Sequence, residues 1–199
     1  SGVSDFNVGQ PVLVFGTGGG RHAEFTVAST DIITALPTNV DLDDAVCIPN
    51  YAIAWCLLKE VAPGGGDRIV YINGAAGGVG SAVVDLARDL GMTTIAGASS
   101  GEKCAFTAER GADYTIDYSR ENVPQRILEI TNGRGVDLAL DQLIGPSFTD
   151  TIPMLAPLGT IVSFNALAGL PKDETFAAMR ANLGKRPGIR CFSWHSFDK

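Results

Sequence analysis

Apolar residues in the middle and C-terminal parts of the chain alternate between short continuous runs and stretches with helical spacing. The runs predict six strands, at residues 68–72, 93–98, 114–116, 136–140, 160–164 and 189–194. Between the first two runs, Val79, Val83 and Leu86 fall on one helical face. Further helices are expected over residues 52–61, 100–111, 123–132 and 175–183. A weaker helix is expected over residues 147–155, which Pro153 should kink or shorten. This alternation predicts an α/β fold with a doubly wound parallel sheet.

The first part of the chain has a different pattern. Short extended segments are expected at residues 11–15, 23–28 and 32–36, and an acidic stretch at residues 41–44 is typical of a helix start. We therefore expect two domains, a small β-rich part over residues 1–46 and an α/β part over residues 47–199.

Composition narrows the class of protein. The 199 residues carry a net charge of −7, which disfavours a general binder of nucleic-acid phosphates. No apolar run reaches the roughly 20 residues that cross a bilayer, and no charged-then-apolar leader is evident, so we expect no membrane segment. Four scattered cysteines without a C-x-x-C pair indicate reduced, mostly buried thiols and a cytoplasmic protein.

A glycine-rich string, NGAAGGVGSA, starts at Asn73, directly after the first α/β strand, and opens the most regular helix. This is the context of a nucleotide-binding loop, in which glycines let the backbone turn sharply and approach a pyrophosphate. The amides at the start of the helix would then face the phosphates. Gly77, Gly78 and Gly80 can supply these properties, so we predict dinucleotide binding.

The end of the next strand indicates which dinucleotide binds. An NAD site usually places Asp or Glu about 20 residues after the loop, whereas Ser99 and Ser100 stand here, followed by Lys103. Small hydroxyl side chains leave room for a 2′-phosphate, which Lys103 can neutralise. We therefore predict NADPH rather than NADH, with Tyr118 and Arg120, after the third strand, as further walls of the pocket. The alternative is that Lys103 is a solvated surface lysine offset by Glu102.

Other candidate chemistry has weaker support. His22 and His195 fit surface positions, and Cys47 and Cys56 lack the spacing of zinc ligands, so we predict no metal site. Asp141 follows the fourth α/β strand, near the expected cofactor crevice, where a turn or capping role is the main alternative.

Several stretches accompany the glycine loop 75–80, at residues 8–12, 20–25, 111–118, 131–137 and 159–164. Together they resemble the zinc-independent quinone oxidoreductase (zeta-crystallin-like) branch of the medium-chain dehydrogenase/reductase superfamily. The resemblance implies a GroES-like catalytic domain, a six-stranded NADP-binding Rossmann domain, and NADPH-dependent reduction of quinones or α,β-unsaturated carbonyls without zinc. Residues 1–46 would be only a partial GroES-like β appendage, because most of the family's catalytic domain has no counterpart here, and no catalytic residue is assigned.

The resemblance also implies roles for individual residues. The expected cofactor-binding residues are Ala76, Gly77, Gly78, Val79, Ser99, Ser100, Lys103, Tyr118 and Phe164. The glycine-loop residues would hold the pyrophosphate, Lys103 and Tyr118 would face the adenosine phosphate, and the backbone of Phe164 would contact the nicotinamide. Family members commonly form homodimers through the sixth strand, here Ile189–Trp194.

Asn50 and Tyr51, at the expected domain junction, are predicted on the substrate side, with simple packing as the alternative. Ile53 stands where the family usually has threonine, and Asn165 where glycine is usual. Three other functions stay open. They are an NADPH-binding module without turnover, an enoyl reductase unit of a multidomain synthase, and a zinc-type alcohol dehydrogenase with ligands outside this chain.

Overall fold

A computed structural model describes residues 4–16, 19–21, 23–62, 67–146, 148–172 and 174–193 of the chain. Contacts divide the chain into two compact units, the first formed mainly by residues up to Asn50 and the second by Tyr51 to Ser193. The division between these units falls inside helix α2 (Ile48–Cys56), after Asn50.

The first unit holds one small antiparallel sheet. β1 (Val12–Val14) pairs with β2 (Ile33–Ala35), which follows a 3₁₀ turn, η1 (Thr30–Ile32). Helix α1 (Leu42–Ala45) is capped by Asp41, whose carboxylate accepts from the Asp43 amide at 2.7 Å. The strand expected at residues 23–28 is wrong. No described strand pairs with this segment, so its alternating pattern has no sheet on which to bury one face.

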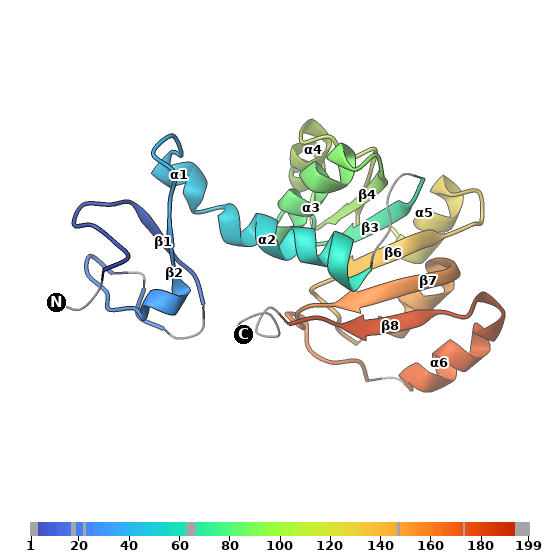
Figure 1. Cartoon of the computed structure of the whole chain (residues 1–199). Coiled ribbons are helices and arrows are strands. Elements are labelled where there is room, and N and C mark those ends of the chain that lie inside the picture. Colours follow the sequence, from blue (N-terminus) through green and yellow to red (C-terminus); the bar gives the residue numbers. More distant parts are fainter. Residues whose placement is uncertain are drawn as a thin grey trace. The chain divides into compact units, whose positions relative to one another are not determined.

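The second unit is built on six parallel strands in the order β5-β4-β3-β6-β7-β8 (Figure 1). The strands are β3 (Ile69–Asn73), β4 (Thr93–Ala98), β5 (Tyr114–Asp117), β6 (Val136–Asp141), β7 (Leu155–Ser163) and β8 (Gly188–Cys191). The predicted doubly wound parallel sheet is therefore confirmed. Its strand order reverses between β3 and β6, and ligands of such sheets bind beyond the carboxyl ends of the strands at this point.

Helices cover both faces of this sheet. The regular ones are α3 (Gly78–Asp89), α4 (Gly101–Glu109), α5 (Val123–Ile130) and α6 (Thr175–Ala181). Shorter segments are the π-helical η2 (Leu57–Val61) and the 3₁₀ segments η3 (Phe148–Met154) and η4 (Leu183–Lys185). The weaker helix expected over residues 147–155 is the 3₁₀ segment η3, in which Pro153 lacks the amide hydrogen that a regular α-helix needs there. Strand β7 begins at Leu155, earlier than expected.

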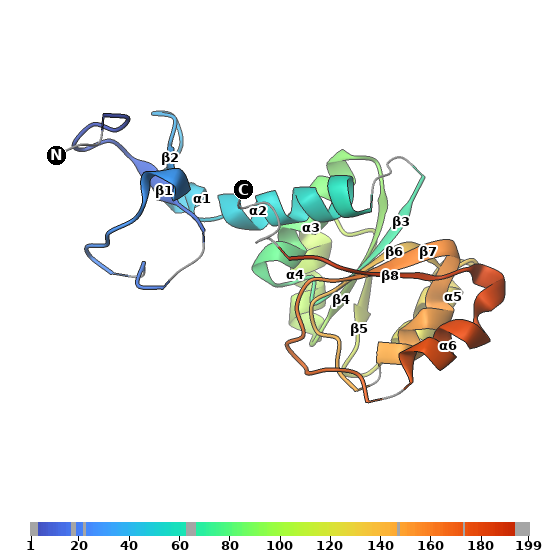
Figure 2. The same ribbon diagram turned by 60° about the horizontal axis from the view of Figure 1, so that its bottom comes forward.

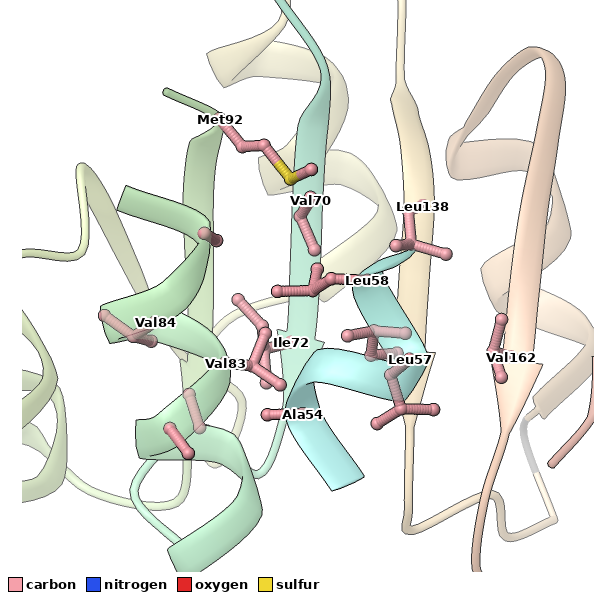
Figure 3. Packing of buried hydrophobic residues seen from close by; sticks show 14 of the residues in the cluster. Ala54, Leu57, Leu58, Val70, Ile72, Val83, Val84, Met92, Leu138 and Val162 are labelled. Carbon is pink, nitrogen blue, oxygen red and sulfur yellow. The ribbon is translucent and has the colours of Figure 1, made fainter. Parts of the chain in front are cut away.

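Two apolar clusters hold the layers together. Leu57 and Leu58 of η2 and Val83 of α3 pack on β3, β6 and β7 from one face (Figure 3). On the opposite face, Ile127 of α5, Ile152 of η3 and Met179 of α6 belong to a second cluster. Figure 2 shows α5 and α6 on this face of the sheet. Burial of these side chains fixes the helices that frame the carboxyl edge of the sheet.

The cysteines differ from expectation. All four are free, but Cys47 and Cys191 are exposed and Cys56 is partly buried, which leaves Cys104 as the buried thiol. The prediction of mostly buried thiols is therefore wrong. Cys191 is the last residue of β8, which lies at the edge of the sheet. Among the described strands, β8 has a neighbour on one side, β7.

Within the described part of the chain, no helix combines the length and the apolar character needed to cross a membrane.

Candidate cofactor site

The glycine loop between β3 and α3 has glycine where the geometry demands it. Gly74 has φ +78°, a left-handed conformation that favours glycine. At Gly80, a Cβ atom would lie 2.5 Å from the Gly74 carbonyl oxygen and 2.7 Å from the Ala75 Cα. Glycine at this position therefore lets α3 pack closely against the end of β3.

The first turn of α3 is open to an anion. Its N-cap residue is Gly77, with extended backbone, and no side chain caps the helix within the described residues. The amides of Gly78 and Val79 thus open the helix with its positive dipole end. This arrangement fits the pyrophosphate of a dinucleotide.

A pocket of about 160 Å³ lies between the loop and the end of β4. Its lining residues are Gly74, Ala76, Gly77, Ala98, Ser99, Lys103 and Tyr118. Five residues predicted from the sequence are therefore brought together, and Lys103 is the charged one among the lining residues. Its Nζ donates to the Ser99 Oγ at 3.0 Å, and the Tyr118 amide is held by the Ala98 carbonyl at 3.0 Å. A cation beside small hydroxyls in this position fits a phosphate monoester.

Ser100 serves the helix rather than the pocket. It is the N-cap of α4, and its Oγ accepts from the Lys103 amide at 3.3 Å. This cap fixes the first turn of α4 and so positions the Lys103 side chain.

A second cavity, of about 600 Å³, shares Tyr118 with this pocket. It extends along the carboxyl ends of β3 and β6, where Asn73, Asp141 and Leu143 line it. Tyr71 also lines it, and burial, reinforced by the nearby Asp141 carboxylate, raises the pKa of the Tyr71 phenol. The phenol is therefore neutral and can donate a hydrogen bond.

Asp141 organises the loop that follows β6. Its side chain is buried, and Oδ1 accepts from the Asn73 Nδ2 at 2.9 Å and from the Leu143 and Ile144 amides at 2.8 and 3.0 Å. Ile144 has φ +56°, a conformation uncommon for a branched residue. The turn role named as the alternative for Asp141 is thus present in the structure.

Sequence reasoning missed two residues of this edge. Asn73 ends β3 and lies opposite Asp141 in the strand register, and Gln142 donates through Nε2 to the Gly74 carbonyl at 3.0 Å. Both residues stand directly at the carboxyl ends of the two strands that flank the order reversal. Their positions directly after two predicted parallel strands could have identified them, because side chains at the carboxyl ends of such strands meet at one edge of the sheet.

Besides Ser100 and the α3 residues Gly78 and Val79, the predicted residues Phe164, Tyr51 and Asn50 line neither cavity. The Phe164 amide donates to the Asp141 carbonyl at 3.2 Å, and its ring packs on the core. Tyr51 donates through its hydroxyl to Asp85 of α3, which also pairs with Arg110 beyond α4. This hydrogen bond to Asp85 raises the pKa of Tyr51. Asn50 lines neither cavity.

Metal ligands do not cluster in the part of the chain that the structure describes. No group of three or more His, Cys, Asp or Glu side chains there could hold an ion. His22, His195 and the predicted end of the sixth strand, Trp194, lie outside the described residues. The prediction of a zinc-free site stays a prediction.

Comparisons with known proteins identify the family of this chain. The family model described as zinc-binding dehydrogenase matches residues 78–194. A quinone oxidoreductase of Pseudomonas aeruginosa is 33% identical over 172 residues, covering 85% of this chain and 52% of that protein. A polyketide synthase subunit of Mycobacterium tuberculosis, named for phenolphthiocerol and phthiocerol, is 32% identical over 193 residues, covering 91% of this chain and 9% of that protein.

A solved mycobacterial structure with bound NADPH superimposes with a TM-score of 0.78 at 26% identity, covering 86% of this chain and 52% of that one. The chain thus spans about half the length of this structure and of the quinone oxidoreductase. The chain belongs to the zinc-binding dehydrogenase family, in the quinone oxidoreductase-like branch of the medium-chain dehydrogenase/reductase superfamily.

Proposed function

We propose that this chain is the cofactor-binding part of an NADPH-dependent, zinc-independent reductase of quinones or α,β-unsaturated carbonyls. The observation that carries the proposal is the pocket in which Ser99, Lys103 and Tyr118 meet beside the open N-terminus of α3. The similarity to a quinone oxidoreductase and to a structure with bound NADPH supports the same substrate class and cofactor.

In this proposal, each residue has a defined task. The amides of Gly78 and Val79 would bind the pyrophosphate beside Gly77, whose own amide donates to the Gly74 carbonyl at 3.1 Å. Lys103 and Ser99 would hold the 2′-phosphate. When bound, NADPH supplies the hydride that reduces the substrate. The chain's own residues orient the cofactor and keep its phosphates fixed, so that the nicotinamide extends toward β7 and the Phe164 backbone.

The remaining expectations are part of the same proposal. Residues 1–46 would belong to a GroES-like catalytic domain and residues 47–199 to the NADP-binding domain, with Asn50 on the substrate side and a cytoplasmic location. We further propose a homodimer through β8. This strand pairs with β7 along one edge, and no other described strand pairs with it. An unpaired edge is a ready site for a second strand.

A reductase unit of a multidomain synthase is the second candidate. The match to the polyketide synthase subunit favours this function, because it covers 91% of this chain, whereas the match to the quinone oxidoreductase covers 85%. The cofactor site is the same in both cases, and the difference lies in the carbonyl substrate.

The test mixes the chain with NADPH and either a small quinone or a short α,β-unsaturated thioester, and follows the absorbance of the reduced nicotinamide. Quinone-dependent oxidation supports the first function, and thioester-dependent oxidation supports the second. Binding of NADPH without oxidation of either substrate would indicate a binding module. Loss of activity with EDTA would contradict the zinc-independent mechanism.

A further inference from the structure

Asp141 carries a carboxylate oxygen that the fold does not use. The residue is 3% exposed, and Oδ1 accepts all three of its hydrogen bonds, from Asn73, Leu143 and Ile144. Within the described part of the chain, Oδ2 has no hydrogen-bond partner. Asp141 lines the cavity beside β3 and β6, so Oδ2 is free to accept a hydrogen bond from a donor on a ligand bound there.

The cavity beside Asp141 differs in character from the Lys103 pocket. Its charged lining residues are the acids Glu121, Asp141 and Asp150, and no cation is among the described residues that line it. Glu121 already accepts from the Asp117 amide at 2.8 Å, and Asp150 is exposed. Asp141 is therefore the buried acid of this cavity, and its Oδ2 oxygen is free to accept a hydrogen bond.

The other walls suit a flat, uncharged ring. Leu143, Ile144 and Phe148 supply apolar surface, and Tyr118 lies in both the cavity and the phosphate pocket. A ligand anchored by a phosphate on Lys103 can therefore extend past Tyr118 into the cavity. An acidic, partly apolar cavity disfavours a second phosphate and favours a neutral ring that donates a hydrogen bond.

We propose that Asp141 is a specificity-determining residue whose Oδ2 accepts a hydrogen bond from the exocyclic amino group of the cofactor's purine. This inference rests on the proposed function, since it requires a dinucleotide with its 2′-phosphate on Lys103. An ionised carboxylate only accepts hydrogen bonds, and an exocyclic amino group donates them. Asn73 and the loop amides act as positioning groups that hold Oδ1 and so aim Oδ2.

The experiment compares NADPH with its reduced hypoxanthine analogue, which carries a carbonyl oxygen in place of the amino group. Both are fluorescent through the reduced nicotinamide, so titration of the 199-residue chain gives both dissociation constants. The wild type is expected to bind the analogue about tenfold or more weakly, because the hydrogen bond to a charged acceptor is lost. Equal binding of the two cofactors overturns the proposal, with no variant needed.

Asp141→Asn sharpens the test. Asparagine can keep its oxygen on the three donors and place its amide nitrogen where Oδ2 stands, which suits the carbonyl of hypoxanthine. The preference for adenine is expected to fall about tenfold or to invert. Asp150→Asn removes another carboxylate of the same cavity. If it moves the ratio and Asp141→Asn does not, the proposal is wrong.

The two levels of inference fail separately. Absence of NADPH binding by the wild type contradicts the proposed function. NADPH binding with an adenine-to-hypoxanthine ratio near one leaves that function standing and removes the role of Asp141. The ribose hydroxyls and the nicotinamide carboxamide also donate hydrogen bonds, but they are identical in both dinucleotides and cannot produce the expected difference.

Discussion

The Lys103 ammonium donates to the Ser99 hydroxyl at 3.0 Å, which joins the first turn of α4 to the end of β4. The two residues line a pocket in which Lys103 is the charged group among the lining residues. Because α4 begins here, its positive dipole end adds to the positive charge of the lysine. The pair is therefore suited to a dianionic phosphate.

Replacement of Lys103 by methionine is expected to weaken NADPH binding about tenfold, because charge-assisted hydrogen bonds to the phosphate are lost. NADH, which lacks that phosphate, should bind with unchanged affinity. Fluorescence titration of both cofactors measures the effect. Lys172→Met is the matched control, since Lys172 is exposed and lies outside the pocket. A parallel loss of NADH affinity would show that Lys103 acts on the fold instead.

Gly80→Ala should harm both the fold and the binding of either cofactor. The added Cβ would stand 2.5 Å from the Gly74 carbonyl oxygen, so α3 must move away from the loop. Such overpacking costs about 1–3 kcal/mol, measurable as a lower melting temperature. At Gly101, a Cβ would meet no atom within 4 Å, and Gly101→Ala should leave stability unchanged or raised. Similar melting temperatures for the two variants would contradict the close approach at Gly80.

Tyr51→Phe tests whether Tyr51 faces the substrate or holds helices together. Its hydroxyl donates to Asp85, and Arg110 donates to the same hydroxyl at 3.3 Å. Loss of the hydroxyl should lower the free energy of unfolding by about 1 kcal/mol in urea denaturation. Asp85→Ala should cost more, because it removes the carboxylate partner of Arg110, whose Nε is already buried without a partner. Unchanged stability together with a raised KM would instead place Tyr51 at the substrate.

Asp137 makes the stability of the fold depend on pH in the acidic range. Burial raises the pKa of this carboxyl, but hydrogen bonds from Arg134 and from the Ile69 amide, at 2.6 and 2.9 Å, outweigh burial and hold the pKa below its ordinary value. A group with a lowered pKa stabilises the fold above its unfolded pKa of about 3.9, and this contribution is lost as pH falls toward the folded pKa. Compared with the wild type, Asp137→Asn should therefore have a lower free energy of unfolding at neutral pH. Its free energy of unfolding should fall less when the pH is lowered below about 5. Parallel stability curves for the two proteins would contradict the assignment.

Local pattern was sufficient for much of this architecture. The helical spacing of Val79, Val83 and Leu86 reflects burial on β3, and counting about 20 residues from the glycine loop located Ser99. Both signals depend on residues close together in the sequence. The same holds for the Ser100 cap, which needs only a hydroxyl before the first turn of a helix.

Long-range pairing lay beyond such reasoning. Asn73 meets Asp141 because β3 and β6 adopt one particular register, and Tyr51 meets Asp85 because α2 packs beside α3. Neither follows from the spacing of apolar residues. The alternation at residues 23–28 predicted a strand, but a strand also needs a neighbour, and the described residues provide none.

The affinities of the wild-type chain for NADPH and NADH, measured side by side by fluorescence titration, test the central claim most directly. If Ser99 and Lys103 hold a 2′-phosphate, NADPH should bind about tenfold or more tightly than NADH at moderate ionic strength. Equal affinity, or tighter binding of NADH, would contradict the cofactor site described above.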